Sequence, residues 1–141
     1  MSTREHYGTL FPAAVVGSLP RPDFVREAVM GERAMDSGRL EQVMDAAVAY
    51  AVTLQEEAGL DVITDGEWRR ASYIGVIAEL AHGVELGRNP ADGRPWTIVT
   101  STLAPKDPGF IAREIEFLKK TTLRKIKATL PAPALLGERM W

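Results

Sequence analysis

Cysteine is absent from the 141 residues, and histidine occurs only at His6 and His82. The absence of cysteine excludes disulfide bonds, thiolate metal ligands and cysteine nucleophiles, and it fits a reducing compartment. No stretch approaches the roughly 18 uninterrupted apolar residues that a spanning helix needs. The segment Met1–Tyr7 is polar and charged, unlike a secretory signal. We therefore expect a cytoplasmic protein.

A strong charge of either sign is missing as well. The chain has 17 Lys and Arg against 19 Asp and Glu, a net charge of -2, and a group of basic residues only between positions 119 and 127. Such a chain has no extended basic field for a phosphate backbone, so we do not expect nucleic-acid binding. Its hydrophobic content of 45% suits one core, hence one domain or a piece of one.

The first half of the chain contains two strand signals and two helix signals. Short apolar runs at Ala13–Val16 and Leu60–Thr64 predict buried strands. A proline and a carboxylate at Pro22 and Asp23 suit the first turn of a helix that continues to about Met30. The clearest helix follows, with apolar residues at three- and four-residue intervals: Leu40, Val43, Met44, Ala47, Val48, Ala51 and Val52.

Capping residues bound that long helix. Asp36 or Ser37 can cap its start, and Gly59 fits the left-handed position just beyond its end.

The second half continues the alternation of strands and helices. We interpret the remaining segments, in order, as a loop and helix at Trp68–Ala81, an excursion at Gly83–Pro95 with turn signals at Asn89-Pro90 and Asp92-Gly93, a third strand at Thr97–Thr100, a helix opening at Asp107-Pro108, and a fourth strand at Ile126–Leu130. Strands separated by helices indicate βαβ units and a parallel sheet. The fold class predicted is α/β, a partial (β/α)8 TIM barrel of about the first four βα units. A complete barrel takes roughly 250 residues, so residues 1–141 are expected to form the N-terminal half.

Three motifs carry a family resemblance in the correct order. They are Val16-Gly17-Ser18-Leu19-Pro20-Arg21-Pro22, then Glu56-Glu57-Ala58-Gly59-Leu60-Asp61-Val62-Ile63-Thr64-Asp65-Gly66-Glu67-Trp68-Arg69-Arg70, then Lys127-Ala128-Thr129-Leu130-Pro131-Ala132-Pro133. Together they resemble the catalytic barrel of cobalamin-independent methionine synthases, and most closely the short, single-barrel members. The resemblance spans nearly the whole chain.

The resemblance implies a methyltransferase site. In that family the equivalents of Val16, Gly17 and Ser18 hold the amino-acid part of homocysteine, and Glu67 contacts the same substrate. The residues support these positions independently, because ligand sites of barrels lie beyond the carboxyl ends of the strands. The alternatives are that Gly17 and Pro20 only shape a turn, and that Glu67 forms a surface salt bridge with an arginine.

Three further residues are candidates for the substrate pocket. Asp65 either lines the pocket or caps the next helix, and these two roles have equal weight. Arg70, like Arg69, is placed to orient the Glu67 carboxylate. By resemblance, Trp141 corresponds to a position near the folate, although a terminal residue can also be disordered.

The family reaction transfers a methyl group from a methyl-folate to homocysteine, and zinc activates the thiol. The family's zinc ligands, including cysteines, come from later strands. His6 and His82 match none of the ligand positions, and we interpret both as solvated. We therefore predict no zinc in this chain.

Several readings remain open on the sequence. The leading one is the front half of a methyltransferase, inactive alone, that self-associates or pairs with a complementary C-terminal half, because an open half-barrel exposes strand edges. The others are a non-catalytic small-molecule-binding or assembly module, and another barrel enzyme of the uroporphyrinogen decarboxylase and corrinoid methyltransferase superfamily. A decarboxylase would need arginines for several propionates, and Arg21, Arg69 and Arg70 are too few to establish that.

Overall fold

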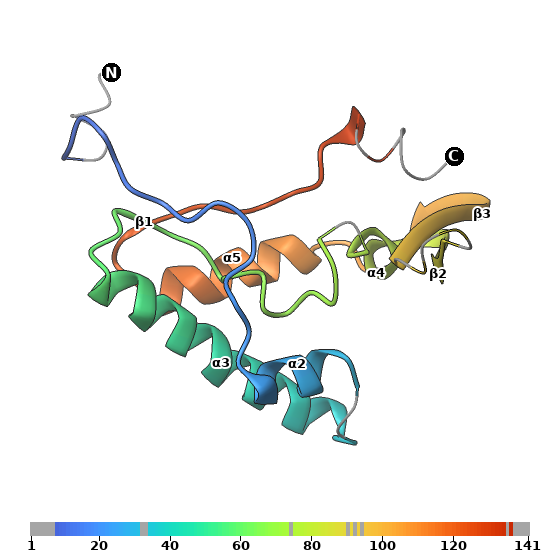
Figure 1. Ribbon diagram of the computed structural model, residues 1–141, viewed down its shortest axis with the longest axis horizontal. Helices are drawn as coiled ribbons and strands as arrows, with labels where there is room; N and C mark the ends of the chain where they lie inside the picture. The colour runs from blue at the N-terminus through green and yellow to red at the C-terminus, as the bar shows by residue number, and fades with distance from the viewer. Residues whose placement is uncertain are drawn as a thin grey trace. The chain divides into compact units, whose positions relative to one another are not determined.

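A computed structural model describes residues 8–31, 34–73, 75–89, 91, 93, 95–134 and 136 (Figure 1). The chain divides into two compact units. The first unit comprises Met1–Arg69 and Ile111–Thr129, and the second comprises Arg70–Phe110 and Leu130–Trp141.

Three helices build most of the first unit: α2 (Asp23–Val29), α3 (Ser37–Glu57) and α5 (Phe110–Thr121). The carboxylate of Asp36 caps α3 by accepting a hydrogen bond from the backbone N–H of Arg39 at 2.9 Å. Gly59 follows the helix with φ of 76°, a left-handed conformation that suits glycine. The boundaries predicted for α2 and α3 from caps and periodicity are thus confirmed.

The strands of the first unit are short and parallel. Ala14 forms a parallel bridge with Val62, and β1 (Val62–Ile63) pairs in parallel with β4 (Lys125–Ile126). The backbone N–H of Lys127 extends this pairing by donating to Ile63 O at 2.9 Å. Short parts of the first, second and fourth predicted strands therefore lie side by side and run in the same direction, with helices between them in sequence. The fourth predicted strand, Ile126–Leu130, is corrected to Lys125–Ile126.

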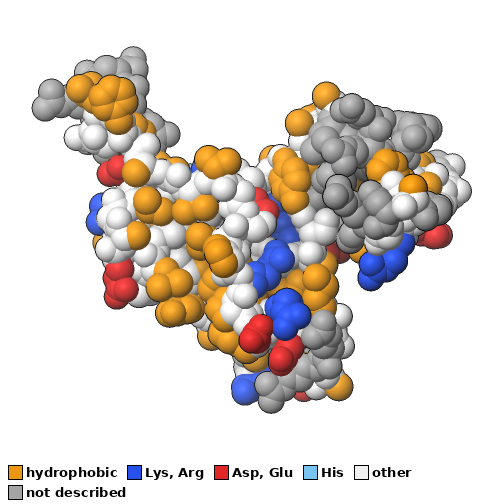
Figure 2. Space-filling model, in the orientation of Figure 1, with side chains coloured by type: hydrophobic (Ala, Val, Ile, Leu, Met, Phe, Trp, Pro, Cys, Tyr) orange, Lys and Arg blue, Asp and Glu red, His pale blue; other side chains and the backbone are white. Residues whose placement is uncertain are grey.

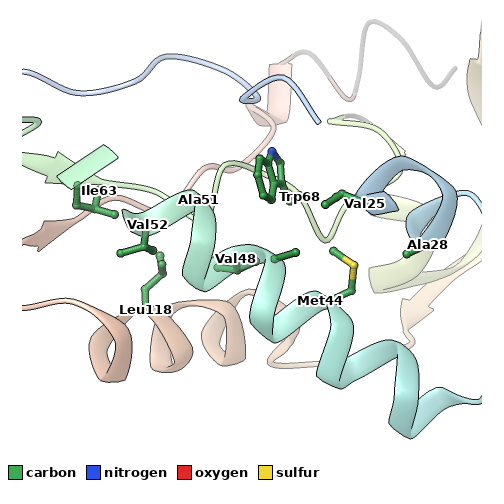
Figure 3. Packing of buried hydrophobic residues seen from close by; sticks show 10 residues of the cluster. Val25, Ala28, Met44, Val48, Ala51, Val52, Ile63, Trp68 and Leu118 are labelled. Atoms are coloured by element: carbon green, nitrogen blue, oxygen red, sulfur yellow. The ribbon is translucent and has the colours of Figure 1, made fainter. Parts of the chain in front are cut away.

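The buried face of α3 supplies the centre of the core. The buried hydrophobic residues that pack together are Val25, Ala28, Met44, Ala47, Val48, Ala51, Val52, Ile63, Trp68 and Leu118 (Figure 3). They come from α2, α3, β1, α5 and the loop after β1. The stripe predicted on α3 is therefore the one that joins the sheet to the other helices.

The second unit contains a hairpin. A four-residue helix α4 (Ile77–Leu80) leads into β2 (Ala81–Arg88), which pairs antiparallel with β3 (Pro95–Pro105). The register of the pairing shifts between His82 and Val84, which pair with Ala104 and Val99. At the turn, Gly93 N–H donates to Asn89 O at 2.8 Å.

This hairpin corrects two predictions. Thr97–Thr100 is part of β3, which is antiparallel to β2 and is not a parallel strand of the barrel sheet. The predicted excursion at Gly83–Pro95 includes most of β2. The physical reason is that the turn residues after Arg88 separate two β-capable runs, which is the pattern of a hairpin. The predicted helix before Ala81 is also shorter than expected, since only Ile77–Leu80 is helical in the part of that segment that is described.

Large hydrophobic side chains also lie at the surface (Figure 2). The most exposed ones among the described residues are Leu10, Phe11, Val16, Met30, Leu103, Leu123 and Leu130. None of the helices described is long and apolar enough to cross a membrane.

Candidate functional site

Two loop segments meet beyond the carboxyl ends of neighbouring parallel strands. Val16–Ser18 follows the strand bridge at Ala14, and Asp65–Glu67 follows β1. The backbone N–H of Leu19 donates to Gly66 O at 3.1 Å, which joins the two loops directly. Parallel strands deliver their carboxyl ends to the same edge of a sheet, so residues 47 positions apart become neighbours.

Glu67 is the centre of this contact. The Ser18 hydroxyl donates a hydrogen bond to Glu67 Oε2 at 2.6 Å. The Arg21 Nη2 donates to the backbone carbonyl of Glu67 at 2.7 Å. Glu67 is only 2% exposed, so its carboxylate is held under the Ser18 side chain. The structure thus brings Ser18 and Glu67 together, as the sequence predicted, with Arg21 as a further contact.

The loop that carries Glu67 is held in a strained conformation. Glu67 has φ of 57°, the left-handed region, which costs a non-glycine residue roughly 1–2 kcal/mol. Its N–H donates to Asp65 Oδ1 at 3.0 Å, and Gly66 N–H donates to Thr64 Oγ1 at 3.1 Å. Such strain persists only where surrounding contacts impose it, and it is concentrated at functional sites.

Asp65 caps this tight turn, not a helix, because its Oδ1 accepts the backbone N–H of Glu67. Its residue is 5% exposed, and within the described part of the chain its Oδ2 atom has no hydrogen-bond partner. A buried carboxylate oxygen without a donor is costly. The capping role and a role toward a ligand are therefore compatible, because they use different oxygens.

Gln55 of α3 fixes the strand from which the Glu67 loop departs. Its Nε2 donates to Thr64 O at 2.8 Å, and its Oε1 accepts from Thr64 N at 3.0 Å. The amide therefore pairs with both backbone groups of Thr64, as a neighbouring strand would. Sequence reasoning missed this contact, since a glutamine at a helix end gives no signal of its partner.

The opposing loop is open to solvent. Val16 is 93% exposed, and Gly17 has φ of 79° with no atom within 4 Å of where a Cβ would be. The backbone of Val16 and Gly17 is thus presented on an uncovered surface. Glycine here permits both the left-handed turn and close approach of a ligand.

An apolar cavity of about 330 Å³ adjoins the loops. It is lined by residues of the first loop, of the end of α3 and of the segments before and after β1. These residues are Val15, Leu19, Pro20, Leu54, Gln55, Ala58, Leu60 and Trp68. The indole N–H of Trp68 donates to Leu19 O at 3.2 Å. Trp68 and Leu19 therefore link the apolar cavity to the polar contact between Ser18 and Glu67.

The other predicted residues have different positions. Arg69 forms an ion pair with Asp45 and lies 5.0 Å from the centre of the Phe117 ring, so it ties α3 to α5 and does not orient Glu67. Arg21 contacts the backbone carbonyl of Glu67. Arg70 is 1% exposed and begins the second unit. His82 is exposed on β2, and His6 and Trp141 lie outside the described residues.

Metal ligands do not gather in the part of the chain that is described. No group of three or more His, Asp or Glu side chains there could hold a metal ion. The sequence contributes no cysteine to such a group. The residues described therefore do not fit a zinc centre.

The fold and the contacts define an α/β protein with a polar site beyond the carboxyl ends of parallel strands. The family model for the catalytic domain of cobalamin-independent synthases matches residues 11–130. The chain belongs to this family.

Individual relatives agree with the family. The methionine synthase of Sulfolobus acidocaldarius is 31% identical over 140 residues, which cover 92% of this chain and 40% of that protein. A protein named 5-methyltetrahydropteroyltriglutamate–homocysteine methyltransferase from Thermotoga sp. strain RQ2 is 27% identical over 136 residues, which cover 90% of this chain and 18% of that protein. The chain thus spans less than half the length of these relatives.

A solved structure shows the same fold. The B12-independent methionine synthase from Shewanella sp. W3-18-1, in complex with selenomethionine, matches with a TM-score of 0.76 at 23% identity. The match covers 92% of this chain and 40% of that one.

Proposed function

We propose that this chain carries the amino-acid-binding part of a homocysteine pocket in a methyltransferase that uses a methyl-folate as donor. We also propose that residues 1–141 form the N-terminal half of a (β/α)8 barrel. The family membership and the names of the relatives support the reaction class. The observation that carries the site is the hydrogen bond of 2.6 Å between Ser18 and Glu67.

In this proposal Glu67 binds the ammonium group of the substrate. A carboxylate accepts charge-assisted hydrogen bonds well, and burial strengthens them. In the structure the Ser18 hydroxyl is hydrogen-bonded to Glu67 Oε2, and Ser18 is exposed to solvent. Rotation of the Ser18 side chain would let a substrate ammonium take its place as donor. Val16, Gly17 and Ser18 then form the backbone wall of the pocket.

The proposal also covers the other predicted pocket residues, Asp65, Arg70 and Trp141. Asp65 Oδ2 is the second acceptor that a substrate ammonium could reach if the loop moves. The role of Arg70 in the pocket and that of Trp141 toward a folate remain predictions. Because the described residues do not fit a zinc centre, no step of the proposal uses the metal.

We propose further that catalysis needs a complementary polypeptide, supplied by a C-terminal half or through a homo-oligomer. Relatives extend well beyond the part that this chain matches. The exposed apolar side chain of Leu54, which lines the apolar cavity, favours association because covering it removes apolar area from water. A non-catalytic binding module would share the pocket and lack turnover.

The test is binding of L-homocysteine and L-methionine to the full chain, measured by isothermal titration calorimetry. Glu67→Gln keeps the size of the side chain and removes the charge, so we expect affinity to fall roughly 10- to 100-fold, the range for a hydrogen bond to a charged group. Glu57→Gln, at an exposed position near the end of α3, is the matched control and is expected to bind like the wild type.

Two outcomes would contradict the proposal. One is a wild-type chain that binds neither amino acid, and the other is equal affinity in Glu67→Gln and wild type. Methyl transfer is then assayed with and without a complementary C-terminal half from a relative. Activity of the isolated chain with added zinc would reject both the binding-module reading and the need for a second polypeptide.

A further inference from the structure

We propose that Lys127 is the cationic half of the site and pairs with the carboxylate of an amino-acid ligand whose ammonium group is bound by Glu67. This inference rests on the proposed function and deepens it by naming the residue that would bind the substrate carboxylate.

Lys127 lies at the carboxyl end of the strand next to β1. Its backbone N–H donates to Ile63 O at 2.9 Å, which fixes the residue to β1. Its side chain crosses to the first strand segment, where Nζ donates to the backbone carbonyl of Val15. Lys127 therefore spans from β4 across β1 to the segment that leads into Val16–Ser18.

The segment Val15–Ser18 is thus bound by a cation at one end and by an anion at the other. Val15 O is bound by the Lys127 ammonium, and the Ser18 hydroxyl is bound by the Glu67 carboxylate. Between them lie the exposed Val16 and the open Gly17. A ligand on this stretch meets a cation at one end and an anion at the other, which is the charge pattern complementary to an α-amino acid.

The Lys127 ammonium has capacity for such a ligand. An ammonium group has three donors, and the contact to Val15 O uses one. The acceptor of this contact is a neutral backbone carbonyl and not a carboxylate. A partly buried cation bound to a neutral acceptor is well suited to an external carboxylate.

Sequence alone does not single out this residue. Lys127 belongs to the group of basic residues between positions 119 and 127, which suggests a solvated surface. The pairing of β4 with β1, together with the contact to Val15, distinguishes it from its neighbours. Lys125, two residues earlier on the same strand, is exposed and serves as a control.

The experiment compares three ligands on the full chain by isothermal titration calorimetry. They are L-methionine, 3-(methylsulfanyl)propylamine, which lacks the carboxylate, and 4-(methylsulfanyl)butanoate, which lacks the ammonium. We expect Lys127→Met to weaken L-methionine binding roughly 10- to 100-fold and to leave binding of the amine within about twofold. Lys127→Arg and Lys125→Met should keep the wild-type preference for L-methionine over the amine.

The ligand comparison separates a binding role from a structural one. If Lys127 only held Val15 in place, Lys127→Met would weaken all three ligands alike, and this result would overturn the inference. Unchanged L-methionine binding in Lys127→Met would overturn it too. If Lys127→Met does not fold, the wild type still decides, because equal affinity for L-methionine and the amine would reject a carboxylate contact.

The outcomes also separate this inference from the proposed function. Loss of L-methionine binding in Glu67→Gln without any effect of Lys127→Met would remove Lys127 and leave the proposed function standing. A wild-type chain that binds none of the three ligands would remove both.

Discussion

The two units bury their strands in different ways. In the first unit the parallel strands lie against α3 and α5, and Ile63 of β1 is completely buried. In the second unit β2 and β3 form a two-stranded hairpin in which, among the residues described, only Val84 and Thr97 are buried. A two-stranded hairpin alone is at best marginally stable in water. The first unit therefore holds the stability and the candidate site, and the hairpin contributes much less to either.

A matched pair of substitutions tests this difference most strongly. Ile63→Ala empties a fully buried position in β1, so we expect a loss of about 2–5 kcal/mol in the free energy of unfolding. Ile98→Ala makes the same change in β3, where the side chain is 43% exposed, and should cost no more than about 0.5 kcal/mol. Urea denaturation followed by circular dichroism measures both. Equal losses would show that the hairpin is covered in solution.

The sequence was sufficient for most of the first unit because its signals are local. Asp36 and Gly59 mark the ends of α3, and the apolar stripe between them identifies its buried face. Polar residues after two predicted strands also sufficed to predict that Ser18 and Glu67 meet, since parallel strands end at one edge. The details of that meeting depend on distant side chains, so Arg21, Gln55 and Lys127 were not predicted as its contacts.

The hairpin was mispredicted because its local signals are ambiguous. Thr97–Thr100 is rich in β-branched residues, a composition typical of both parallel and antiparallel strands. The direction of pairing is decided by contacts between segments, which the composition of one strand does not reveal. An alternation of buried and exposed residues, as in Thr97 and Ile98, is typical of an antiparallel strand with one exposed face.

The next largest effect concerns the register shift of the hairpin at Gly83. Gly83 has φ of 80°, and an added Cβ would lie 2.5 Å from Thr102 O. Gly83→Ala should therefore destabilise the hairpin by about 1–3 kcal/mol. Hydrogen exchange by NMR should show faster exchange in β2 and β3 with little change in α3.

Gly87→Ala is the control for this substitution. It lies on the same strand, and its nearest atom would be 3.8 Å from the added Cβ. We expect exchange rates close to those of the wild type. Faster exchange throughout α3 in Gly83→Ala would mean that the stability of the first unit depends on the hairpin.

The smallest expected effect is a pH dependence of stability that comes from Glu79 in the second unit. Glu67 accepts a hydrogen bond from Ser18, whereas burial raises the pKa of Glu79 in α4 above its ordinary value of 4.5, against the opposing charges of Lys106 and Arg70. A raised pKa means that the folded state binds the proton more tightly than the unfolded chain does. The stability from this group is therefore fully present below the ordinary pKa and is lost as the pH rises through the raised pKa.

Glu79→Gln should remove this decline, because the amide stays neutral at every pH. We expect the variant to be slightly more stable than the wild type at neutral pH, as measured by thermal unfolding between pH 4 and pH 8. Lys106→Met should move the titration of Glu79, followed by carbon-detected NMR, to still higher pH, because Lys106 lowers the pKa of Glu79 more than Arg70 does. A Glu79 titration at or below its ordinary value would show that the charges of the second unit outweigh burial. Glu79 would then act as an ion-paired surface carboxylate, in clear contrast to the buried Glu67 of the first unit.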